Sequence, residues 1–264
     1  MTATTSPDAP VRVEYLDDGA VLTLTRPAKL NTITKPMLLG LSALIDELEA
    51  SGKRLLVITG EGTKAFCAGT DLGEAQRLSK PERSDKSRMA RELLARLSRS
   101  KLVSVAAVNG LAFGGGLEVA MCCMFRVAAA HATFSLPEIK LGVLPAYGGT
   151  QFLPSLVGPA RALDMMLTGR VVPSDEALSM GLINRAVPAG GDVVGAALAY
   201  AREITKFSPT AIAGIRRCVA AFGEVTDNGL LAEDALVRQV GDSDDAREGV
   251  AAFLEKRPAV FTGR

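Results

Sequence analysis

The feature that most constrains this chain is a glycine cluster, Gly110-Leu-Ala-Phe-Gly-Gly-Gly-Leu-Glu118, placed between two apolar stretches. Residues 102–108 before it are typical of a buried strand, and Val119-Ala-Met-Cys122 after it continue as an apolar helix wall. Glycines allow backbone conformations and close approaches that other residues cannot adopt. Because N–H groups at the start of a helix are free to bind an oxygen atom, the cluster predicts a polarising N–H beside a carboxylate.

The first half of the chain alternates strands with helices. Apolar alternation around a turn predicts a hairpin over residues 11–25, and a leucine-rich stripe predicts a helix over residues 34–52. Further strands are expected over residues 54–59, 102–108 and 125–130. We therefore expect a mixed α/β fold in which the order strand, strand, helix repeats.

The charged stretch over residues 74–101 predicts a mobile charged loop with a break at Pro81, followed by a helix. From Pro173 onward the spacing of apolar residues predicts mostly helix, over residues 193–204, 211–221, 230–240 and 246–254. With 264 residues, 48% of them hydrophobic, the chain has enough apolar side chains for one large core. We expect a flexible tail over residues 1–10, a core over residues 11–200 and a helical portion over residues 201–264.

The composition excludes several classes of partner. Lys and Arg number 30 against 29 Asp and Glu, so no overall field attracts nucleic acid. Charged residues interrupt every apolar stretch before it reaches the roughly 18 residues that a membrane span needs. Cys67, Cys122, Cys123 and Cys218 lack the spacing and the nearby histidine of a zinc site. We expect a cytoplasmic protein with reduced cysteines, no bound metal, and no nucleic-acid or membrane partner.

A second glycine-containing loop, Phe66-Cys-Ala-Gly-Thr-Asp-Leu72, follows the strand expected over residues 54–59. On its own it is typical of a strand-to-helix turn in which Asp71 caps a helix. Small residues at the end of a strand are also able to direct a backbone N–H at a ligand. Two such loops could hold one carbonyl oxygen between them as an oxyanion hole. The residues alone leave both interpretations open.

The motifs of nucleotide-binding and serine-hydrolase sites do not occur. Valine at position 119 breaks the Gly-x-Gly-x-x-Gly spacing, and Leu117-Glu118 stand where a phosphate-binding loop needs lysine. The single histidine, His131, comes at an expected strand end, and no Gly-x-Ser-x-Gly is present, so we expect His131 to be structural. Acid–base chemistry then falls to carboxylates, and Glu118 and Glu138 both have apolar neighbours, which raise a carboxyl pKa. The alternative is a pair of unrelated carboxylates at helix starts.

Five segments together carry a specific combination of residues: Arg26-Pro-Ala-Lys-Leu-Asn31, Ala65-Phe-Cys-Ala-Gly-Thr-Asp-Leu72, Val108-Asn-Gly-Leu-Ala-Phe-Gly-Gly-Gly-Leu-Glu-Val-Ala120, Phe134-Ser-Leu-Pro-Glu-Ile-Lys-Leu-Gly-Val-Leu-Pro145 and Gly148-Gly-Thr-Gln151. In this combination the chain resembles the enoyl-CoA hydratase/isomerase superfamily, also called the crotonases. The resemblance runs from about Val11 to Arg257, and residues 247–257 are similar to the closing helix of that family.

The resemblance implies an α/β spiral of repeated β-β-α units. It also implies that the helical portion over residues 201–264 mediates trimers, often paired as hexamers. The implied ligand is an acyl-CoA thioester, in which coenzyme A is part of the substrate, so no permanently bound cofactor is expected.

The family holds the thioester oxygen with two backbone N–H groups, which fall here on Thr70 and Gly115. Its hydratases place two glutamates at the double bond, and both matching positions, Glu118 and Glu138, are glutamate in this chain. The resemblance implies that Glu118 activates water and that Glu138 exchanges the alpha proton, converting trans-2-enoyl-CoA to 3-hydroxyacyl-CoA in fatty-acid or related metabolism. Isomerases of the family typically retain one carboxylate at these places.

Further positions match residues that line the coenzyme A channel or contact the ligand. Lys29 and Lys256 are candidates for phosphate contacts, although a solvated lysine is the usual state of this residue. The complete set implied for substrate and coenzyme A is Ala28, Lys29, Leu30, Ala68, Gly69, Asp71, Leu72, Gly114, Ala146 and Lys256.

Three departures from the family pattern stand out. Met124 replaces an aspartate that is common after the glutamate-bearing helix, which removes a polar anchor near the next strand. Thr32 and Tyr147 are bulkier than the residues usual at their positions, and either could narrow the acyl pocket. Alternatives to the hydratase are an isomerase, a hydratase of a non-fatty acyl-CoA, an inactive acyl-CoA-binding or scaffold protein and, ranked lowest, a serine peptidase of related fold.

Overall fold

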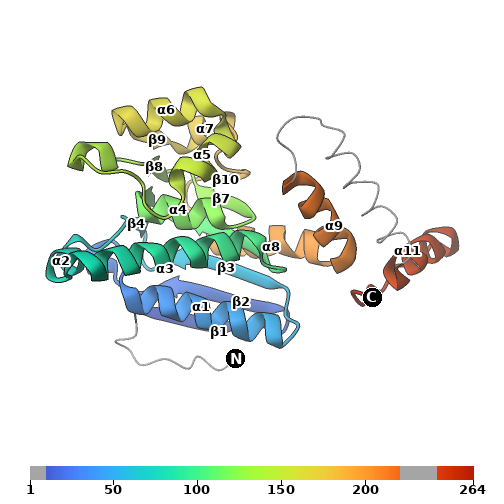
Figure 1. Ribbon diagram of the computed structural model, residues 1–264. Coiled ribbons are helices and arrows are strands. Elements are labelled where there is room, and N and C mark those ends of the chain that lie inside the picture. The colour runs from blue at the N-terminus through green and yellow to red at the C-terminus, as the bar shows by residue number, and fades with distance from the viewer. Residues whose placement is uncertain (1–9, 221–242) are drawn as a thin grey trace. The chain divides into compact units, whose positions relative to one another are not determined.

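The computed structural model describes residues 10–220 and 243–264, and it shows repeated strand-strand-helix turns (Figure 1). From β3 onward, each repeat has a longer first strand, a three-residue second strand and then a helical segment. The predicted α/β class is confirmed, and so are the hairpin and the three later strands. These repeats comprise β1 (Val11–Tyr15), β2 (Gly19–Leu24), α1 (Lys35–Ala50), β3 (Leu55–Gly60), β4 (Ala65–Cys67), α2 (Leu72–Arg77), α3 (Lys80–Arg99), β5 (Val103–Val108), β6 (Leu111–Phe113), α4 (Gly115–Cys122), β7 (Phe125–Ala129), β8 (Thr133–Ser135) and the 3-10 turn η2 (Glu138–Leu141).

First and second strands form separate sheets. The larger sheet has the order β1-β2-β3-β5-β7-β10, where β10 is Arg185–Val187, and is parallel except for the β1–β2 hairpin. The smaller sheet has the order β4-β6-β8-β9, where β9 is Val172–Pro173, and is parallel except for the β8–β9 pair. Every residue of β3 and β5 is buried, as expected for central parallel strands covered on both faces.

The short strands determine where the loops after them meet. β4, β6 and β8 are parallel neighbours, so their carboxyl ends lie at one edge of the smaller sheet. That edge carries Gly69 and Thr70 after β4, Gly114 and Gly115 after β6, and Glu138 after β8. Three residues are too few to show an alternating pattern, which is why the sequence did not reveal these strands.

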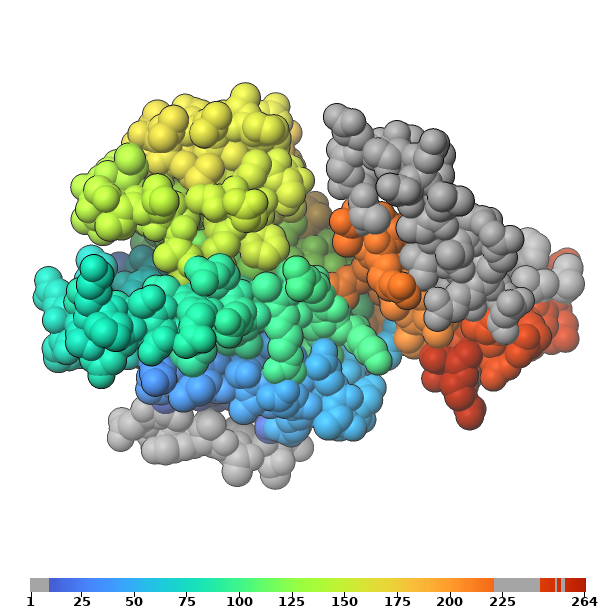
Figure 2. All heavy atoms as spheres, in the orientation of Figure 1, coloured from blue at the N-terminus to red at the C-terminus, as the bar shows by residue number. Residues whose placement is uncertain are grey.

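The prediction of a mobile charged loop in the first part of residues 74–101 is wrong, because this region is helical. α2 and α3 are separated only by Leu78 and Ser79, and Ser79 and Glu82 form a reciprocal capping box at the start of α3. Pro81 lies in the first helical turn, where its missing N–H is not needed, so it begins the helix instead of breaking it. In Figure 2, α2 and α3 form a blue-green band between the blue α1 and the yellow-green to yellow α5 (Gly149–Val157) and α6 (Pro159–Thr168).

The remainder of the described chain is mostly helical, as predicted, although β10 is a strand that the sequence did not indicate. The predicted helix over residues 230–240 lies outside the described residues, as does nearly all of the predicted tail over residues 1–10. The elements are α5 (Gly149–Val157), α6 (Pro159–Thr168), β9 (Val172–Pro173), α7 (Ser174–Ser179), β10 (Arg185–Val187), α8 (Val193–Thr205), α9 (Pro209–Ala220) and α11 (Asp244–Glu255).

The chain divides into two compact units, residues 1–201 and residues 202–264. In the second unit, the buried Asp245 accepts hydrogen bonds from the backbone N–H groups of Thr262 (2.6 Å) and Gly263 (3.0 Å), which fold the last residues back onto α11. The role of this unit in trimer formation stays a prediction.

Over the part of the chain that the structure describes, no helix is both long enough and apolar enough to cross a membrane.

The packing of α4 on β4 depends on Gly116. A Cβ at Gly116 would lie 2.1 Å from the Cys67 carbonyl oxygen, so the helix and the strand would have to separate. We expect Gly116→Ala to lower the free energy of unfolding, measured in urea, by at least about 2 kcal/mol. Gly249→Ala on α11 is the matched control, because its Cβ would meet nothing closer than 3.5 Å. The control should be neutral or stabilising by about 0.5 kcal/mol; equal losses in the two variants would contradict this account.

Candidate active site

The loops after β4 and β6 lie against each other. A Cβ on Gly69 would be 3.5 Å from Gly115 N and 3.7 Å from Gly114 Cα. The contact between the two loops requires glycine at both positions, because Gly69 (φ +105°) and Gly114 (φ +51°) adopt backbone conformations that are strained for other residues. Within residues 10–220 and 243–264, neither the Thr70 N–H nor the Gly115 N–H donates a hydrogen bond. Two adjacent loops thus offer two free donors, which is the arrangement an oxyanion requires.

The Thr70 loop is fixed from both sides of its backbone. Ile33 N donates to the Gly69 carbonyl (2.8 Å) and Asp71 N donates to the Ile33 carbonyl (3.0 Å), so the Thr70 peptide is held between two hydrogen bonds. The Asp71 carboxylate accepts from Glu74 N and pairs with Arg26 at 2.8 Å. These contacts lower the pKa of Asp71, the bond from Glu74 N contributing most. Asp71 is therefore the helix cap that the sequence suggested as one alternative, and the loop also presents a free N–H.

A second ion pair holds the same region from α3. Lys86 is 4% exposed; its Nζ donates to the Ile33 carbonyl (3.1 Å) and pairs with the Glu74 carboxylate. Glu74 in turn accepts from Lys35 N at the start of α1. This pair could not be recognised in the sequence, because lysine and glutamate are common on exposed helix faces.

Asn31 anchors the loop that precedes Ile33. It is fully buried, its Nδ2 donates to the carbonyls of Glu61 (3.1 Å) and Ala65 (2.9 Å), and its Oδ1 accepts from Arg26 N (3.0 Å). Asn31 and Leu30 have φ values of 56° and 50°, in the left-handed region that non-glycine residues seldom occupy. The three side-chain bonds hold this turn in place beside β4.

Glu118 lies in the first turn of α4 and is 1% exposed. Its Oε1 accepts two hydrogen bonds from backbone N–H groups near the start of α5, from Tyr147 (2.8 Å) and Gly149 (2.7 Å). Burial raises the pKa of Glu118 to about 7, partly opposed by these N–H groups and further raised by the charge of Glu138. A carboxyl group with this pKa is able both to take up and to release a proton near neutral pH.

Glu138 begins η2, three residues after the end of β8. A Cβ on Gly114 would lie 3.0 Å from Glu138 Oε1, so this carboxyl group touches the second donor loop. Among the described residues, Oε2 of Glu138 is buried and has no hydrogen-bond partner. Burial raises the pKa of Glu138, and a hydrogen bond from its own backbone N–H opposes the shift in part. Glu118 lies on the helix that begins at this same loop, and the charge of Glu138 is near enough to raise the pKa of Glu118, so the structure brings both carboxyl groups to the loop after β6.

Tyr147 fills the space between these groups. Its ring lies against Gly115, where a Cβ would be 2.9 Å from Cε2, and its hydroxyl oxygen accepts from the Thr70 hydroxyl at 2.8 Å. The sequence identified Tyr147 only as a bulky departure from the family pattern. Thr32, the other bulky departure, accepts from Arg26 in the neighbouring loop and lies half-buried there.

The other predicted contact positions are distributed over several segments. Ala28, Lys29 and Leu30 lie in an exposed turn, and Ala68 is half-buried with its N–H bonded to the Leu30 carbonyl at 2.9 Å. Leu72 is 58% exposed at the first residue of α2, and Ala146 is exposed directly before Tyr147. Lys256 belongs to the second unit, just after α11, and its predicted phosphate contact stays a prediction.

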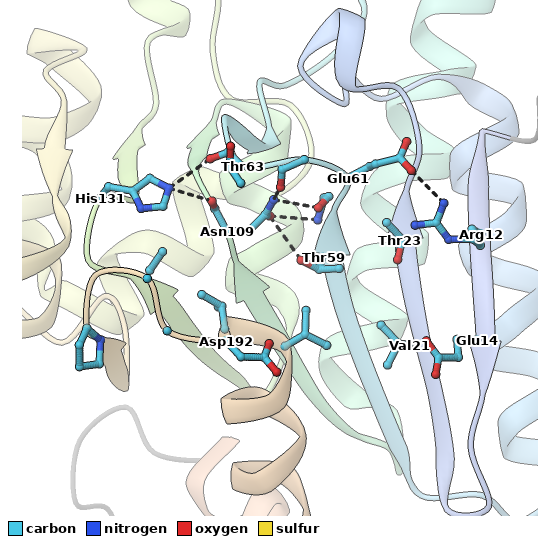
Figure 3. A pocket seen from close by; sticks show the side chains of 18 residues that line it. Arg12, Glu14, Val21, Thr23, Thr59, Glu61, Thr63, Asn109, His131 and Asp192 are labelled. Atoms are coloured by element: carbon cyan, nitrogen blue, oxygen red, sulfur yellow. Dashed lines mark hydrogen bonds and ion pairs between the residues drawn. The ribbon is translucent and has the colours of Figure 1, made fainter.

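His131 lies at one end of a separate hollow, lined by residues of β1, β2 and β3 and by the start of α8 (Figure 3). Its Nε2 is 3.1 Å from the carbonyl oxygens of both Thr63 and Asn109. Two acceptors at one nitrogen require that nitrogen to carry a proton, so it is not available as a base. This geometry agrees with the structural role expected for His131.

The position of Met124 is stabilised without the aspartate common in the family. Met124 N donates to the Ser104 hydroxyl at 2.9 Å. The buried Arg126 donates to the carbonyls of Leu182 (2.7 Å) and Cys123 (3.0 Å), which fix the start of β7. The lost polar anchor therefore leaves α4 and Glu118 in place.

A model of the enoyl-CoA hydratase/isomerase family matches residues 18–264. The chain belongs to this family. It is 35% identical over 254 residues to a crotonyl-CoA hydratase of Syntrophomonas wolfei, covering 93% of this chain and 95% of that protein. An enoyl-CoA isomerase/hydratase of Zymoseptoria tritici is 36% identical over 259 residues, covering 92% of this chain and 83% of that protein. A crystal structure of an enoyl-CoA hydratase from Bacillus anthracis matches with a TM-score of 0.91 at 31% identity, covering 97% of this chain and all of that one.

The raised pKa of Glu118 has a consequence for stability. A carboxyl group whose pKa is higher in the folded state stabilises the fold below its unfolded pKa of 4.5, and this contribution is lost as the pH rises through about 7. We expect the free energy of unfolding of Glu118→Gln, relative to wild type, to increase by about 3 kcal/mol between pH 4.5 and pH 8. Urea unfolding at both pH values measures this difference. Glu14→Gln, at an exposed position of β1, is the control, and an equal pH dependence in the two variants would refute the assignment.

Proposed function

We propose that this member of the family hydrates trans-2-enoyl-CoA to 3-hydroxyacyl-CoA. The observation that carries the proposal is the pair of carboxyl groups at the loop after β6, the buried Glu118 and the half-buried Glu138, whose Oε2 is buried. A crotonyl-CoA hydratase and a short-chain-enoyl-CoA hydratase are among the similar proteins, which supports the same reaction here. The substrate class is an acyl-CoA thioester, with coenzyme A as part of the substrate and no permanently bound cofactor.

In the proposed mechanism the Thr70 and Gly115 N–H groups bind the thioester oxygen. Charge grows on this oxygen as the enolate forms, so donors fixed beforehand stabilise the transition state more than the substrate. Each such donor is worth about 3 kcal/mol of barrier in comparable sites. The polarised thioester makes the beta carbon electrophilic, which opens it to attack by water.

The two glutamates divide the proton transfers. Ionised Glu118 accepts a proton from water while the hydroxide oxygen bonds to the beta carbon, and protonated Glu138 delivers a proton to the alpha carbon of the enolate. The product gains the elements of one water molecule, and the proton left on Glu118 returns to Glu138 before the next turnover. Because their charges interact, the pair is best described as sharing one proton, with pKa values that belong to both groups.

The proposal also includes the residues that contact the ligand and the oligomeric state of the protein. Ala28, Lys29 and Leu30 are proposed to line the adenine and pantetheine channel, and Ala68 and Leu72 to contact the ligand. Lys29 and Lys256 are proposed to contact phosphate groups, and Ala146 to lie at the helix start that faces the water. We further propose a cytoplasmic homotrimer or homohexamer that acts in fatty-acid or related acyl-CoA metabolism. An analytical ultracentrifugation measurement of the purified protein distinguishes monomer, trimer and hexamer.

Double-bond isomerisation is the second candidate, because similar proteins carry the combined name isomerase/hydratase. Isomerisation moves one proton from one carbon of the acyl chain to another and adds no water, so a single carboxyl group suffices. Incubation with 2-enoyl-CoA and 3-enoyl-CoA of several chain lengths, with product identification, separates the two reactions. Binding of acyl-CoA without any turnover would instead favour an inactive acyl-CoA-binding protein.

Replacing either glutamate should remove most hydration. We expect Glu118→Gln and Glu138→Gln each to lower kcat for crotonyl-CoA at least about 100-fold, because each removes one proton transfer. The loss of the ultraviolet absorbance of the enoyl thioester measures the rate. Glu92→Gln, on the exposed face of α3, is the control and should keep wild-type kcat. Near-normal activity in both site variants would rule out the mechanism.

A further inference from the structure

Tyr147 contacts three of the four groups to which the proposed function assigns a role. Its backbone N–H donates to Glu118 Oε1 at 2.8 Å, and its hydroxyl oxygen accepts from the Thr70 hydroxyl at 2.8 Å. Its ring lies against Gly115, where a Cβ would come within 2.9 Å of Cε2. One residue therefore reaches the proposed base with its backbone N–H and both loops of the proposed oxyanion hole with its side chain.

Tyr147 is also the buried anchor of an otherwise exposed segment. It is 3% exposed, whereas Leu141, Val143 and Leu144 are 62%, 53% and 73% exposed. Of residues 139–148, Tyr147 alone is buried. The segment begins directly after Glu138, so its fixed end near Glu118 is set by the packing of this tyrosine.

The phenol stays protonated under all ordinary conditions. Burial raises the pKa of Tyr147 to about 12, and the nearby Glu118 charge adds to this effect. A neutral phenol that already accepts a hydrogen bond from Thr70 is suited to holding that residue in place. It does not carry protons in a reaction near neutral pH.

We propose that Tyr147 is a positioning residue that fixes the Thr70 loop relative to Glu118. The inference rests on the proposed function, in which Thr70 binds the thioester oxygen and Glu118 activates water. The substrate oxygen and the attacking water must keep a set separation, and small displacements of such groups cost rate more than binding. The hydroxyl–hydroxyl contact between Thr70 and Tyr147 supplies that constraint from a loop that is remote in sequence.

Tyr147→Phe isolates this contact, because it keeps the ring against Gly115 and the backbone N–H to Glu118. We expect kcat for crotonyl-CoA hydration to fall about tenfold while KM changes less than about twofold. Tyr200→Phe is the matched control: the Tyr200 ring packs on Phe125 at 4.9 Å and on Arg185 at 3.8 Å, so its kcat should be unchanged. A Tyr147→Phe variant with a lower melting temperature and wild-type kcat would overturn the proposal.

A double-mutant cycle with Thr70→Val distinguishes positioning from general damage. Both substitutions remove the same hydrogen bond, so the double variant should be no slower than the slower single variant. Losses in kcat that simply multiply would show that the two side chains act independently, and would overturn the proposal.

A second reaction separates this inference from the proposed function. Exchange of the alpha protons of butyryl-CoA in D₂O, followed by NMR, needs oxyanion donors and a carboxylate base but no addition of water. If the wild type exchanges protons but does not hydrate crotonyl-CoA, the hydratase proposal fails. The Tyr147 inference is then tested by the exchange rate of Tyr147→Phe, which we expect to be about tenfold lower than that of the wild type. A wild type that does neither overturns both proposals.

Discussion

The structure depends on the close approach of two backbone segments, the start of α4 and the loop after β4. Gly116 lets α4 rest on the Cys67 carbonyl, and Gly69 lets its loop lie against Gly114 and Gly115. A side chain at Gly116 would separate the helix from the strand, and one at Gly69 would be both strained and crowded. The same contact brings the Thr70 and Gly115 N–H groups to one place, so the packing that builds the core also builds the donor pair.

The buried carboxyl group of Glu118 and the half-buried one of Glu138, next to this contact, are costly to the fold. Glu118 is compensated in part by two backbone N–H groups, and Glu138 has an oxygen with no partner among the described residues. Apolar residues at both positions would remove that cost. We therefore interpret the two glutamates as a functional feature whose cost the surrounding core offsets. The ion pairs of Asp71 with Arg26 and of Lys86 with Glu74 hold the Thr70 loop beside them in place.

Much of the fold and of the candidate site could be predicted from the sequence. The hairpin, the longer strands, and the helix that begins in the glycine cluster have strong local patterns, and Glu118 and Glu138 stood out by elimination of other acid–base groups. The three-residue strands, the helical nature of the first part of residues 74–101 and the ion pair of Lys86 were missed. A strand of three residues shows no period, and a proline that begins a helix has the same local signature as one that ends a segment. Tyr147 was noticed for its size, but its contacts with Thr70 and Glu118 join loops far apart in the sequence.

The sequence by itself determined the family, the alternation of strands and helices, and which residues were able to act as acids, bases and donors. These properties follow from residue type and from spacing over a few turns of chain. Only the tertiary structure decided that the loops after β4, β6 and β8 meet at one edge, because parallel pairing of the short strands sets their neighbours. It also decided the protonation behaviour of Glu118, since that depends on the burial and on the N–H groups supplied by Tyr147 and Gly149 from another part of the chain.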